Sequence, residues 1–426
     1  MTSPLTTSSA RQLARLIRSG EVSSSEVMET HLSRIEELNP TINAIVALAP
    51  DANQRAAEAD RQLRRGAGLG PLHGVPFTVK DIIETADLPT TLGLPERAGT
   101  RGQRDASIVA RMRAAGGILL TKTNCPPGGS GGDTVNDLFG RTRNPYDAGR
   151  TAGGSSGGEA AAIAGGMSVC GLGSDSGGSL RVPAHFCGIA TLKPTAGRLP
   201  LTGILDEDGP IGSMSDPRTQ PGPMARRVED LVLLLGVLAG PDGLDAGVMP
   251  VSLGDAATVG LRGLRVLRHV LGGDASPDAD TQRTLSQAAQ SLTDAGARIV
   301  ERSLPTGGHE LTERIWGSYD GTLSSTDLYD VLRAWDRYRT DMLALLADVD
   351  LILSPVAPTP APAIGGHTDF RYTTPYSLTG WPCVVVRAGT SDGLPVGVQV
   401  VAGPWLDHVA LAAAARIEAD LGGWHS

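Results

Sequence analysis

Long apolar runs and an excess of basic charge are both missing from this sequence. No run of about 18 apolar residues is present to cross a membrane, and the polar start lacks the apolar stretch of a signal peptide. Lys and Arg number 37 against 46 Asp and Glu, and a formal net charge of -9 disfavours binding to nucleic acid or to an anionic membrane surface. We therefore expect a small neutral or amide molecule as partner, with no nucleic acid and no membrane.

Cysteine is scarce, and its spacing matches neither a metal site nor a Cys-x-x-Cys motif. We expect reduced thiols in a cytoplasmic protein rather than disulfides at the four positions Cys125, Cys170, Cys187 and Cys383. His73 and His185 have no carboxylate or thiol partner at ligand spacing. No glycine cluster continues into a phosphate-binding Gly-Lys-Ser/Thr, and no dinucleotide fingerprint is present. The expectation is therefore no metal and no cofactor.

Glycine and proline fall in many short turns, so no linker divides the chain. The 55 glycines and 29 prolines are spread along it, and we expect a single domain over residues 1–426. An apolar strand at 75–79, a helix at 107–115 and a strand at 118–120 follow one another. This alternation predicts an α/β fold with a large, mixed and mostly parallel central sheet flanked by helices. Later strands are expected at 169–171, 264–269, 298–302, 351–353, 383–387 and 396–401.

The N-terminal segment, residues 1–66, is predicted to be a helical scaffold. Ser8 or Ser9 caps a first helix, which stops at Gly20. Ser23 or Ser24 caps a second one, which we expect to end before Pro40 because proline removes a backbone donor. A third runs from Asp51 to about Arg65. The catalytic core is placed in 72–200, and 201–426 supplies the rest of the sheet, the cleft loops and helices.

The first of two serine-bearing glycine clusters runs from residue 153 to 158. Ser156 and Glu159 have capping-box spacing ahead of a helical run at 160–164. Ser155 would then lie just before a helix start, where backbone amides carry partial positive charge. A glycine-rich helix cap without chemistry is the alternative interpretation.

The second cluster, Ser176-Gly177-Gly178-Ser179, offers four successive backbone amides. Such a turn suits the negative charge that develops on a carbonyl oxygen, because its donors are fixed and carry little side-chain bulk. Ser179 would be the attacking group. A serine that caps a short helical turn is the alternative.

Lys80 follows the apolar run 75–79, so its side chain should be enclosed at a strand end. Burial lowers the pKa of an ammonium group, and a neutral lysine can take a proton from a serine directly or through a second hydroxyl. The alternative is a lysine whose amine reaches solvent from the strand end.

Residues 153–157 also match Gly-x-Ser-x-Gly, the nucleophile elbow of α/β-hydrolases. Ser155 would then be the nucleophile, with an aspartate and a histidine further along. The elbow follows a strand, however, and residues 147–152 are polar and turn-like. No downstream histidine lies in a recognisable loop after a terminal strand.

Taken together, these motifs make the sequence resemble the amidase signature hydrolases, relatives of fatty acid amide hydrolase and of the glutamyl-tRNA(Gln) amidotransferase A subunit. The strongest block contains Gly153-Gly-Ser-Ser-Gly-Gly-Glu, Gly173-Ser-Asp-Ser-Gly-Gly-Ser-Leu-Arg-Val-Pro and Cys187-Gly-Ile-Ala-Thr-Leu-Lys-Pro-Thr. Further landmarks are Gly74-Val-Pro-Phe-Thr-Val-Lys-Asp, Gly140-Arg-Thr-Arg-Asn-Pro-Tyr, Gly222-Pro-Met-Ala-Arg and Leu394-Pro-Val-Gly-Val-Gln-Val-Val. The resemblance covers nearly the whole chain and implies one amidase signature domain.

The resemblance implies a role for each member of a Ser-Ser-Lys triad. Ser179 would be the acylated nucleophile, Ser155 the bridging serine on a cis peptide, and Lys80 the base. The amides of the second cluster would hold the oxyanion, at Ser176, Gly177, Gly178 and Ser179.

Residues 124–139 depart from the family's bulkier substrate-lining loop. Here the loop is rich in glycine, and we expect Gly129 and Ser130, with Ser155, to contact substrate in a roomy or mobile acyl pocket. A disordered turn is the alternative interpretation of these glycines. The segment from about 270 to 370 is also short for the family, so we expect an open cleft bordered by Trp316, Tyr319 and Tyr376.

The resemblance implies a serine hydrolase acting on carbon–nitrogen bonds other than peptide bonds. We expect an amidase for small aryl or aliphatic amides, with carbamates and esters as further substrates and with a homodimer as an allowed state. One alternative is an A-type subunit of glutamyl-tRNA(Gln) amidotransferase, which works only with partners. A catalytically silent binding protein is another, and the presence of Lys80, Ser155 and Ser179 argues against it.

Overall fold

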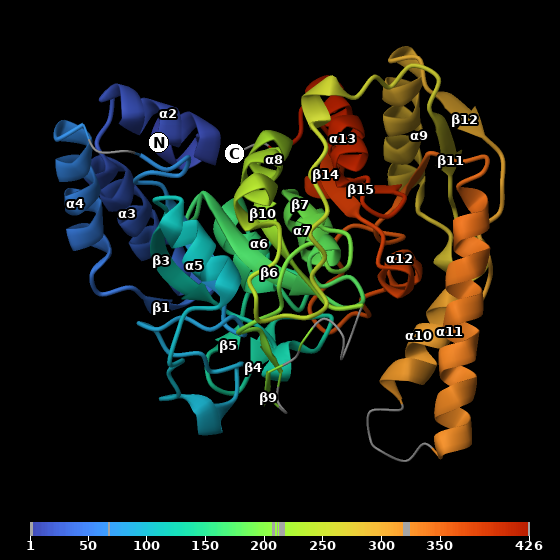
Figure 1. The fold of residues 1–426 in the computed structure, drawn as a ribbon, viewed down its shortest axis with the longest axis horizontal. Helices are drawn as coiled ribbons and strands as arrows, with labels where there is room; N and C mark the ends of the chain where they lie inside the picture. The colour runs from blue at the N-terminus through green and yellow to red at the C-terminus, as the bar shows by residue number, and fades with distance from the viewer. Residues whose placement is uncertain are drawn as a thin grey trace.

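One large sheet organises the chain in the computed structural model of the protein (Figure 1). The structure describes residues 3–66, 69–206, 209–210, 212, 218–317 and 324–424. In order across the sheet, its strands are β1 (Ile45–Leu48), β3 (Ile118–Thr123), β2 (Pro76–Lys80), β6 (Cys170–Asp175), β10 (Gln220–Ala225), β7 (Ala190–Lys193), β14 (Cys383–Ser391), β15 (Leu394–Ala402), β13 (Leu351–Pro355), β11 (Arg265–Arg268) and β12 (Arg298–Val300). Two small hairpins are β4 (Val135–Asn136) with β5 (Gly140–Arg141) and β8 (Leu205–Asp206) with β9 (Gly209–Pro210).

The sheet is mixed, as expected, but the expectation that it is mostly parallel is wrong. Strands β3, β2 and β6 run parallel at one side, and β13, β11 and β12 run parallel at the other. From β6 through β10, β7, β14 and β15 to β13, every neighbouring pair is antiparallel. The tight β14–β15 hairpin contributes to this arrangement, because a short turn can join only antiparallel strands.

Local capping signals position the N-terminal helices α2 (Ala10–Ser19) and α3 (Ser24–Ile42). Ser9 and Ser23 each form a capping box, with Gln12 and Glu26 respectively. Gly20 ends α2 in the left-handed conformation that glycine adopts easily. The expected stop before Pro40 is wrong, since α3 continues through this proline for two more residues.

Two groups of helices pack on the sheet. Helices α8 (Val228–Leu238), α13 (Asp407–Leu421) and α9 (Ala279–Asp294) form one layer against β10, β14 and β15. Helices α6 (Gly157–Ala164) and α7 (Arg181–Cys187) pack on each other and on the central strands. Every residue of α6 and α7 is buried, so the segments that follow the two serine clusters lie in the core. The remaining helix bounds are α1 (Pro4–Thr7), α4 (Ala52–Arg64), α5 (Ser107–Ala114), α10 (Gly308–Trp316), α11 (Ser325–Leu345) and α12 (Thr374–Thr379).

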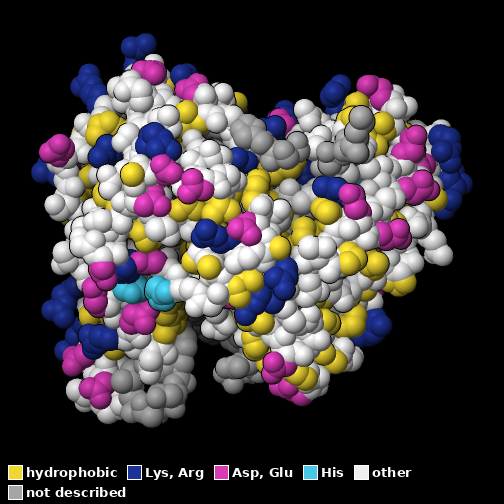
Figure 2. All heavy atoms as spheres, turned by 180° about the vertical axis from the view of Figure 1, so that it is seen from behind, with side chains coloured by type: hydrophobic (Ala, Val, Ile, Leu, Met, Phe, Trp, Pro, Cys, Tyr) yellow, Lys and Arg dark blue, Asp and Glu magenta, His cyan; other side chains and the backbone are white. Residues whose placement is uncertain are grey.

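Helices α10, α11 and α12 pack together around a second hydrophobic core beside the β11–β12 side of the sheet (Figure 1). Seen from behind, this part of the molecule projects at the lower left, with a notch between it and the rest (Figure 2). Tyr376 belongs to that core and is 0% exposed, so the expectation that it borders an open cleft is wrong. Tyr319 lies outside the described residues.

Candidate active site

Lys80 ends strand β2 and is 0% exposed, so its side chain does not reach solvent. Its Nζ donates to Ser155 Oγ at 2.6 Å and to Ser174 Oγ at 3.0 Å. Burial lowers the pKa of Lys80 to about 8, although Cys125, Asp175 and Glu159 act in the opposite direction. A substantial fraction of this amine is therefore neutral at mildly alkaline pH, with a hydroxyl in contact that it can deprotonate.

The peptide bond between Gly154 and Ser155 is cis, as the family resemblance implies. Gly154 faces the backbone of the 124–139 loop, and a Cβ there would lie 2.9 Å from the backbone nitrogen of Asp133. Ser155 is 1% exposed, whereas Ser179 is partly exposed. A buried Ser155 in contact with Lys80 does not suit the exposed nucleophile of an α/β-hydrolase elbow.

The predicted capping box at the start of α6 is absent. Ser156 occupies the N-cap position but makes no side-chain cap, and its Oγ instead donates to the backbone oxygen of Ser174 at 3.2 Å. Glu159 turns inward, where it accepts hydrogen bonds from Thr78 and Thr123. Ser156 also donates its backbone N–H to the oxygen of Ser179 at 3.2 Å, and this bond brings the two serine clusters together.

The second cluster forms a tight turn between β6 and α7, with Gly178 at φ 148°, a conformation that favours glycine. Within the described residues, the backbone amides of Gly177, Gly178 and Ser179 donate to no acceptor. Ser176 lies at the start of the turn, and its hydroxyl is 2.5 Å from that of Thr219. Amides left free in this way are able to bind an oxyanion.

A buried ion pair anchors this turn. Asp175 accepts from Arg181 Nη2 at 2.8 Å and from the backbone N–H of Leu180 at 3.1 Å. Burial raises the pKa of Asp175, but the charge and hydrogen bonds of Arg181 outweigh it and the pKa is lowered overall. Arg181 also donates to Thr373 O and Ser377 Oγ, both at 2.7 Å, and so ties the turn to α12.

Two aromatic rings contact the same turn from outside. A Cβ at Gly177 would lie 2.6 Å from Cη2 of Trp316, and one at Gly178 would lie 2.9 Å from Cδ1 of Phe370. The two rings meet edge to face, with centroids 6.5 Å apart. Both side chains are partly exposed, so they form a wall beside Ser179. Trp316 was expected from the sequence, whereas Phe370 was missed because no local pattern singles it out.

The loop 124–139 lies against the Gly154–Ser155 peptide, as its predicted role requires. Gly129 is half-buried and contacts Ile82, since a Cβ there would lie 2.9 Å from Ile82 Cγ2. Ser130, which follows the short turn Pro127–Gly129, is exposed. The structure therefore places this loop beside the first cluster, with Ser130 open to solvent.

Ser174 is a site residue that sequence reasoning missed. It lies on β6, 94 residues from Lys80, and accepts the second hydrogen bond of the lysine. Its position in the Gly173-Ser174-Asp175 motif was the available signal. The amine of Lys80 is therefore held by two hydroxyls, those of Ser155 and Ser174.

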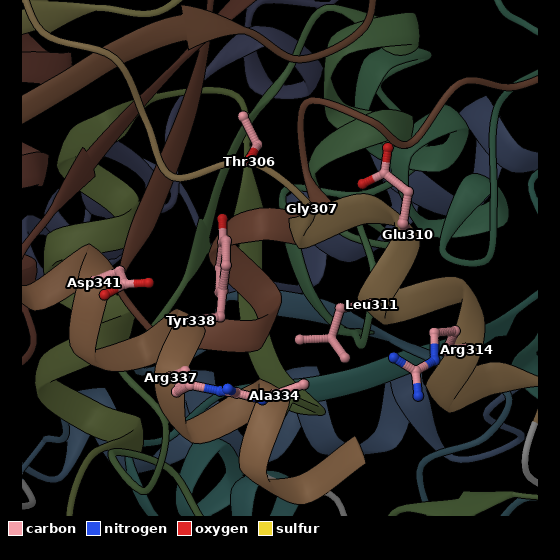
Figure 3. Close-up of a pocket in the computed structure, with 9 residues that line it drawn as sticks. All are labelled: Thr306, Gly307, Glu310, Leu311, Arg314, Ala334, Arg337, Tyr338 and Asp341. Carbon is pink, nitrogen blue, oxygen red and sulfur yellow. The ribbon is translucent and has the colours of Figure 1, made fainter. Parts of the chain in front are cut away.

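A pocket of about 340 Å³ lies elsewhere, between α10 and α11 (Figure 3). Figure 3 shows Glu310 and Arg314 on one helix and Arg337 and Asp341 on the other, with Tyr338 between them. None of the predicted catalytic residues lines it, and its acidic and basic side chains are of equal number.

All four cysteines are free and buried, as expected. In the part of the chain that the structure describes, no three His, Cys, Asp or Glu side chains gather as a metal site. Among the same residues, no helix is long and apolar enough to cross a membrane.

The sequence and the fold of this chain are similar to those of known proteins. A family described as Amidase matches residues 26–328 and 317–411. The chain is 35% identical to an acylamidase of Rhodococcus erythropolis, over 96% of this chain and 95% of the relative. It is 34% identical to the A subunit of a glutamyl-tRNA(Gln) amidotransferase from Chloroflexus aurantiacus, over 96% of both. The solved structure of a bacterial aryl acylamidase of the amidase signature enzymes superposes with a TM-score of 0.83 at 26% identity, over 98% of this chain and 97% of that one.

Proposed function

Because the chain belongs to the amidase family of hydrolases that act on carbon–nitrogen bonds, we propose that it is a stand-alone amidase for small aryl or aliphatic amides, with carbamates and esters as further substrates. The observation that carries this proposal is the 2.6 Å contact between the buried Nζ of Lys80 and Ser155 Oγ. It supplies a base whose pKa is lowered by burial and a hydroxyl to relay the proton.

The proposed reaction proceeds by acyl transfer. Neutral Lys80 takes a proton from Ser155 as Ser155 takes one from Ser179, and Ser179 Oγ bonds to the substrate carbonyl carbon. The amides of Ser176, Gly177, Gly178 and Ser179 stabilise the resulting oxyanion. The proton then returns through Ser155 to the leaving nitrogen, the C–N bond breaks, and water repeats these steps on the acyl-enzyme.

Trp316 and Phe370 support aryl groups as part of the substrate. Their edge-to-face rings contact the turn that carries Ser179, so a ring held near the scissile bond would meet an aromatic surface. The exposed Ser130 and half-buried Gly129 leave the opposite loop without bulk to exclude such a ring.

Trp316→Ala is expected to lower kcat/KM for a p-nitroanilide roughly fivefold to tenfold, since an aromatic contact contributes about 1 kcal/mol. A short aliphatic primary amide should be affected little. The matched control is Tyr329→Ala, which removes an aromatic ring that is 63% exposed on α11. An equal loss for both substrates would contradict a role of Trp316 in ring recognition.

The second candidate function is a partner-dependent component of an amidotransferase, favoured by the 34% identity to one. The net charge of -9 weighs against a tRNA partner. On the face drawn in Figure 2, Lys and Arg side chains are interspersed with Asp and Glu, without a continuous basic patch. These observations support the stand-alone enzyme.

The isolated chain is expected to hydrolyse a p-nitroanilide and a p-nitrophenyl ester without any partner. Esters should react as well, because their leaving group needs less help from a proton than an amine does. A panel of anilides, primary amides, carbamates and esters measures this directly. If no member of the panel reacts with the purified chain, the partner-dependent function replaces the one proposed here.

A further inference from the structure

Glu159 is a fully buried carboxylate whose role the capping pattern does not explain. It is 0% exposed on α6, and it accepts from Thr123 Oγ1 at 2.8 Å and from the hydroxyl of Thr78. Thr78 Oγ1 is in turn 2.8 Å from Ser168 Oγ. Gly171 leaves room for the carboxylate, since any Cβ there would collide with Glu159 Oε1.

The two hydroxyls that bind Glu159 come from adjacent strands. One belongs to Thr78 on β2, the strand that carries Lys80, and the other to Thr123 on the neighbouring strand β3. Thr78 lies two residues before Lys80 on β2 and therefore on the same face of the strand. Thr123 is the residue of β3 that stands opposite Lys80 in the parallel pairing. The carboxylate is thus bound by the two residues that flank Lys80, one on its own strand and one on the next, and the charges of Glu159 and Lys80 act on each other.

We propose that Glu159 is a positioning residue of the catalytic relay, whose buried carboxylate stabilises the ammonium form of Lys80 and so sets the pH above which Lys80 acts as a base. This inference rests on the proposed role of Lys80. It adds a fourth side chain, supplied by α6, to the proposed set of Lys80, Ser155 and Ser179.

Glu159 is suited to this role because its carboxyl group gains its negative charge within the pH range in which Lys80 loses its proton. Burial raises the pKa of Glu159 to about 7, against the hydrogen bonds from Thr78 and Thr123 and the charge of Lys80. Burial also raises the pKa of Cys125 to about 12, so this neighbour stays a neutral thiol. Asp175, whose pKa is lowered overall, stays ionised in its ion pair with Arg181.

The ionisable side chains of the other elements packed on α6 have partners of their own or a fixed charge state, and Lys122 on β3 faces Asp81. Burial holds the pKa of Cys170, on β6, well above its ordinary value, and β10 contains no ionisable side chain. The ionisable side chains of α7 have partners of their own: Arg181 pairs with Asp175, His185 bonds to Thr359 and Gly397, and Cys187 bonds to Ala152.

The direction of the effect follows from the charges. An ionised carboxylate favours the protonated amine and holds the pKa of Lys80 up. In Glu159→Gln a neutral amide of the same shape replaces it, so Lys80 loses its proton at lower pH. The acidic limb of the pH profile should move down by about one pH unit, the size expected for removing a nearby opposite charge.

The test measures the rate at which a neutral fluorophosphonate labels Ser179 between pH 5 and 9.5. In the unchanged protein this rate should rise with pH, with a midpoint near the Lys80 pKa of about 8. Glu159→Gln should shift the midpoint down, and Glu159→Asp, which keeps the charge, should shift it less. Glu58→Gln is the matched control, since Glu58 lies on α4, away from the site, and should leave the profile unchanged.

A Glu159→Gln protein that is slower at every pH with an unmoved midpoint would show a structural role and overturn the proposal. Should that variant fail to fold, Thr123→Val decides. It removes one donor to the ionised carboxylate, so Glu159 stays neutral to higher pH and the midpoint shifts down by a smaller amount. An unmoved midpoint in Thr123→Val also overturns the proposal. Labelling at another residue, or a pH-independent rate in the unchanged protein, would instead overturn the proposed function and this inference with it.

Discussion

Ser179→Ala is expected to abolish labelling by a fluorophosphonate and to lower amide hydrolysis by at least about 10⁴-fold. Ser179 is partly exposed in the turn whose amides are free, and removing the attacking oxygen removes the acyl-enzyme altogether. The measurement is single-turnover hydrolysis of a p-nitroanilide, together with identification of the labelled peptide by mass spectrometry.

Two variants make this result specific. Ser286→Ala, a matched change at an exposed serine of α9, should label as the unchanged protein does. Ser155→Ala should also slow the reaction strongly, because it removes the hydroxyl that Lys80 contacts and that relays the proton in the proposed mechanism. Labelling that persists in Ser179→Ala and maps to Ser155 would refute the assignment and restore the elbow interpretation.

Lys80→Met should lower kcat/KM by at least about 10³-fold, since removing any one member of a catalytic relay abolishes most of its rate enhancement. Methionine keeps the buried apolar stem but removes the amine that holds Ser155 and Ser174. The rise of the rate through pH 8, which reflects loss of the Lys80 proton, should vanish with it. The readout is the pH profile of kcat/KM.

Lys122→Met provides the matched comparison, because Lys122 is also fully buried and lies on the neighbouring strand β3. Its amine donates to Ile83 O and Thr90 Oγ1 and faces Asp81, away from the serines. This variant should lose stability, since it leaves the Asp81 charge unpaired, but keep its reaction per folded molecule. Near-normal activity in Lys80→Met would reject lysine as the base.

Local sequence signals predicted many of the helices and strands, but not how all of the strands pair in the sheet. Apolar runs placed β2 and β3, and cap residues placed the starts of α2 and α3. Strand β10 was missed because Pro221 and Pro223 argue against a central strand, yet it lies between β6 and β7. Its pairing with β7 involves only Met224 and Ala225, beyond both prolines.

The candidate site shows the same limit. The family resemblance brought together Lys80 and Ser155, which the structure places in contact. The capping-box prediction for Glu159 failed because its partners, Thr78 and Thr123, are 81 and 36 residues away. The three-residue spacing between Ser156 and Glu159 indicates only that a capping box is possible. It carries no information about distant partners, such as Thr78 and Thr123, that the sheet brings close to Glu159.

The buried ion pair between Asp175 and Arg181 bears on which parts of the candidate site tolerate substitution. Arg181 joins the turn that carries the proposed nucleophile Ser179 to Thr373 and Ser377, and this ion pair is fully buried. Trp316 touches that turn only from its outer side. If the proposed function holds, replacing Trp316 or Phe370 should change which substrates react while the buried support of the turn stays the same.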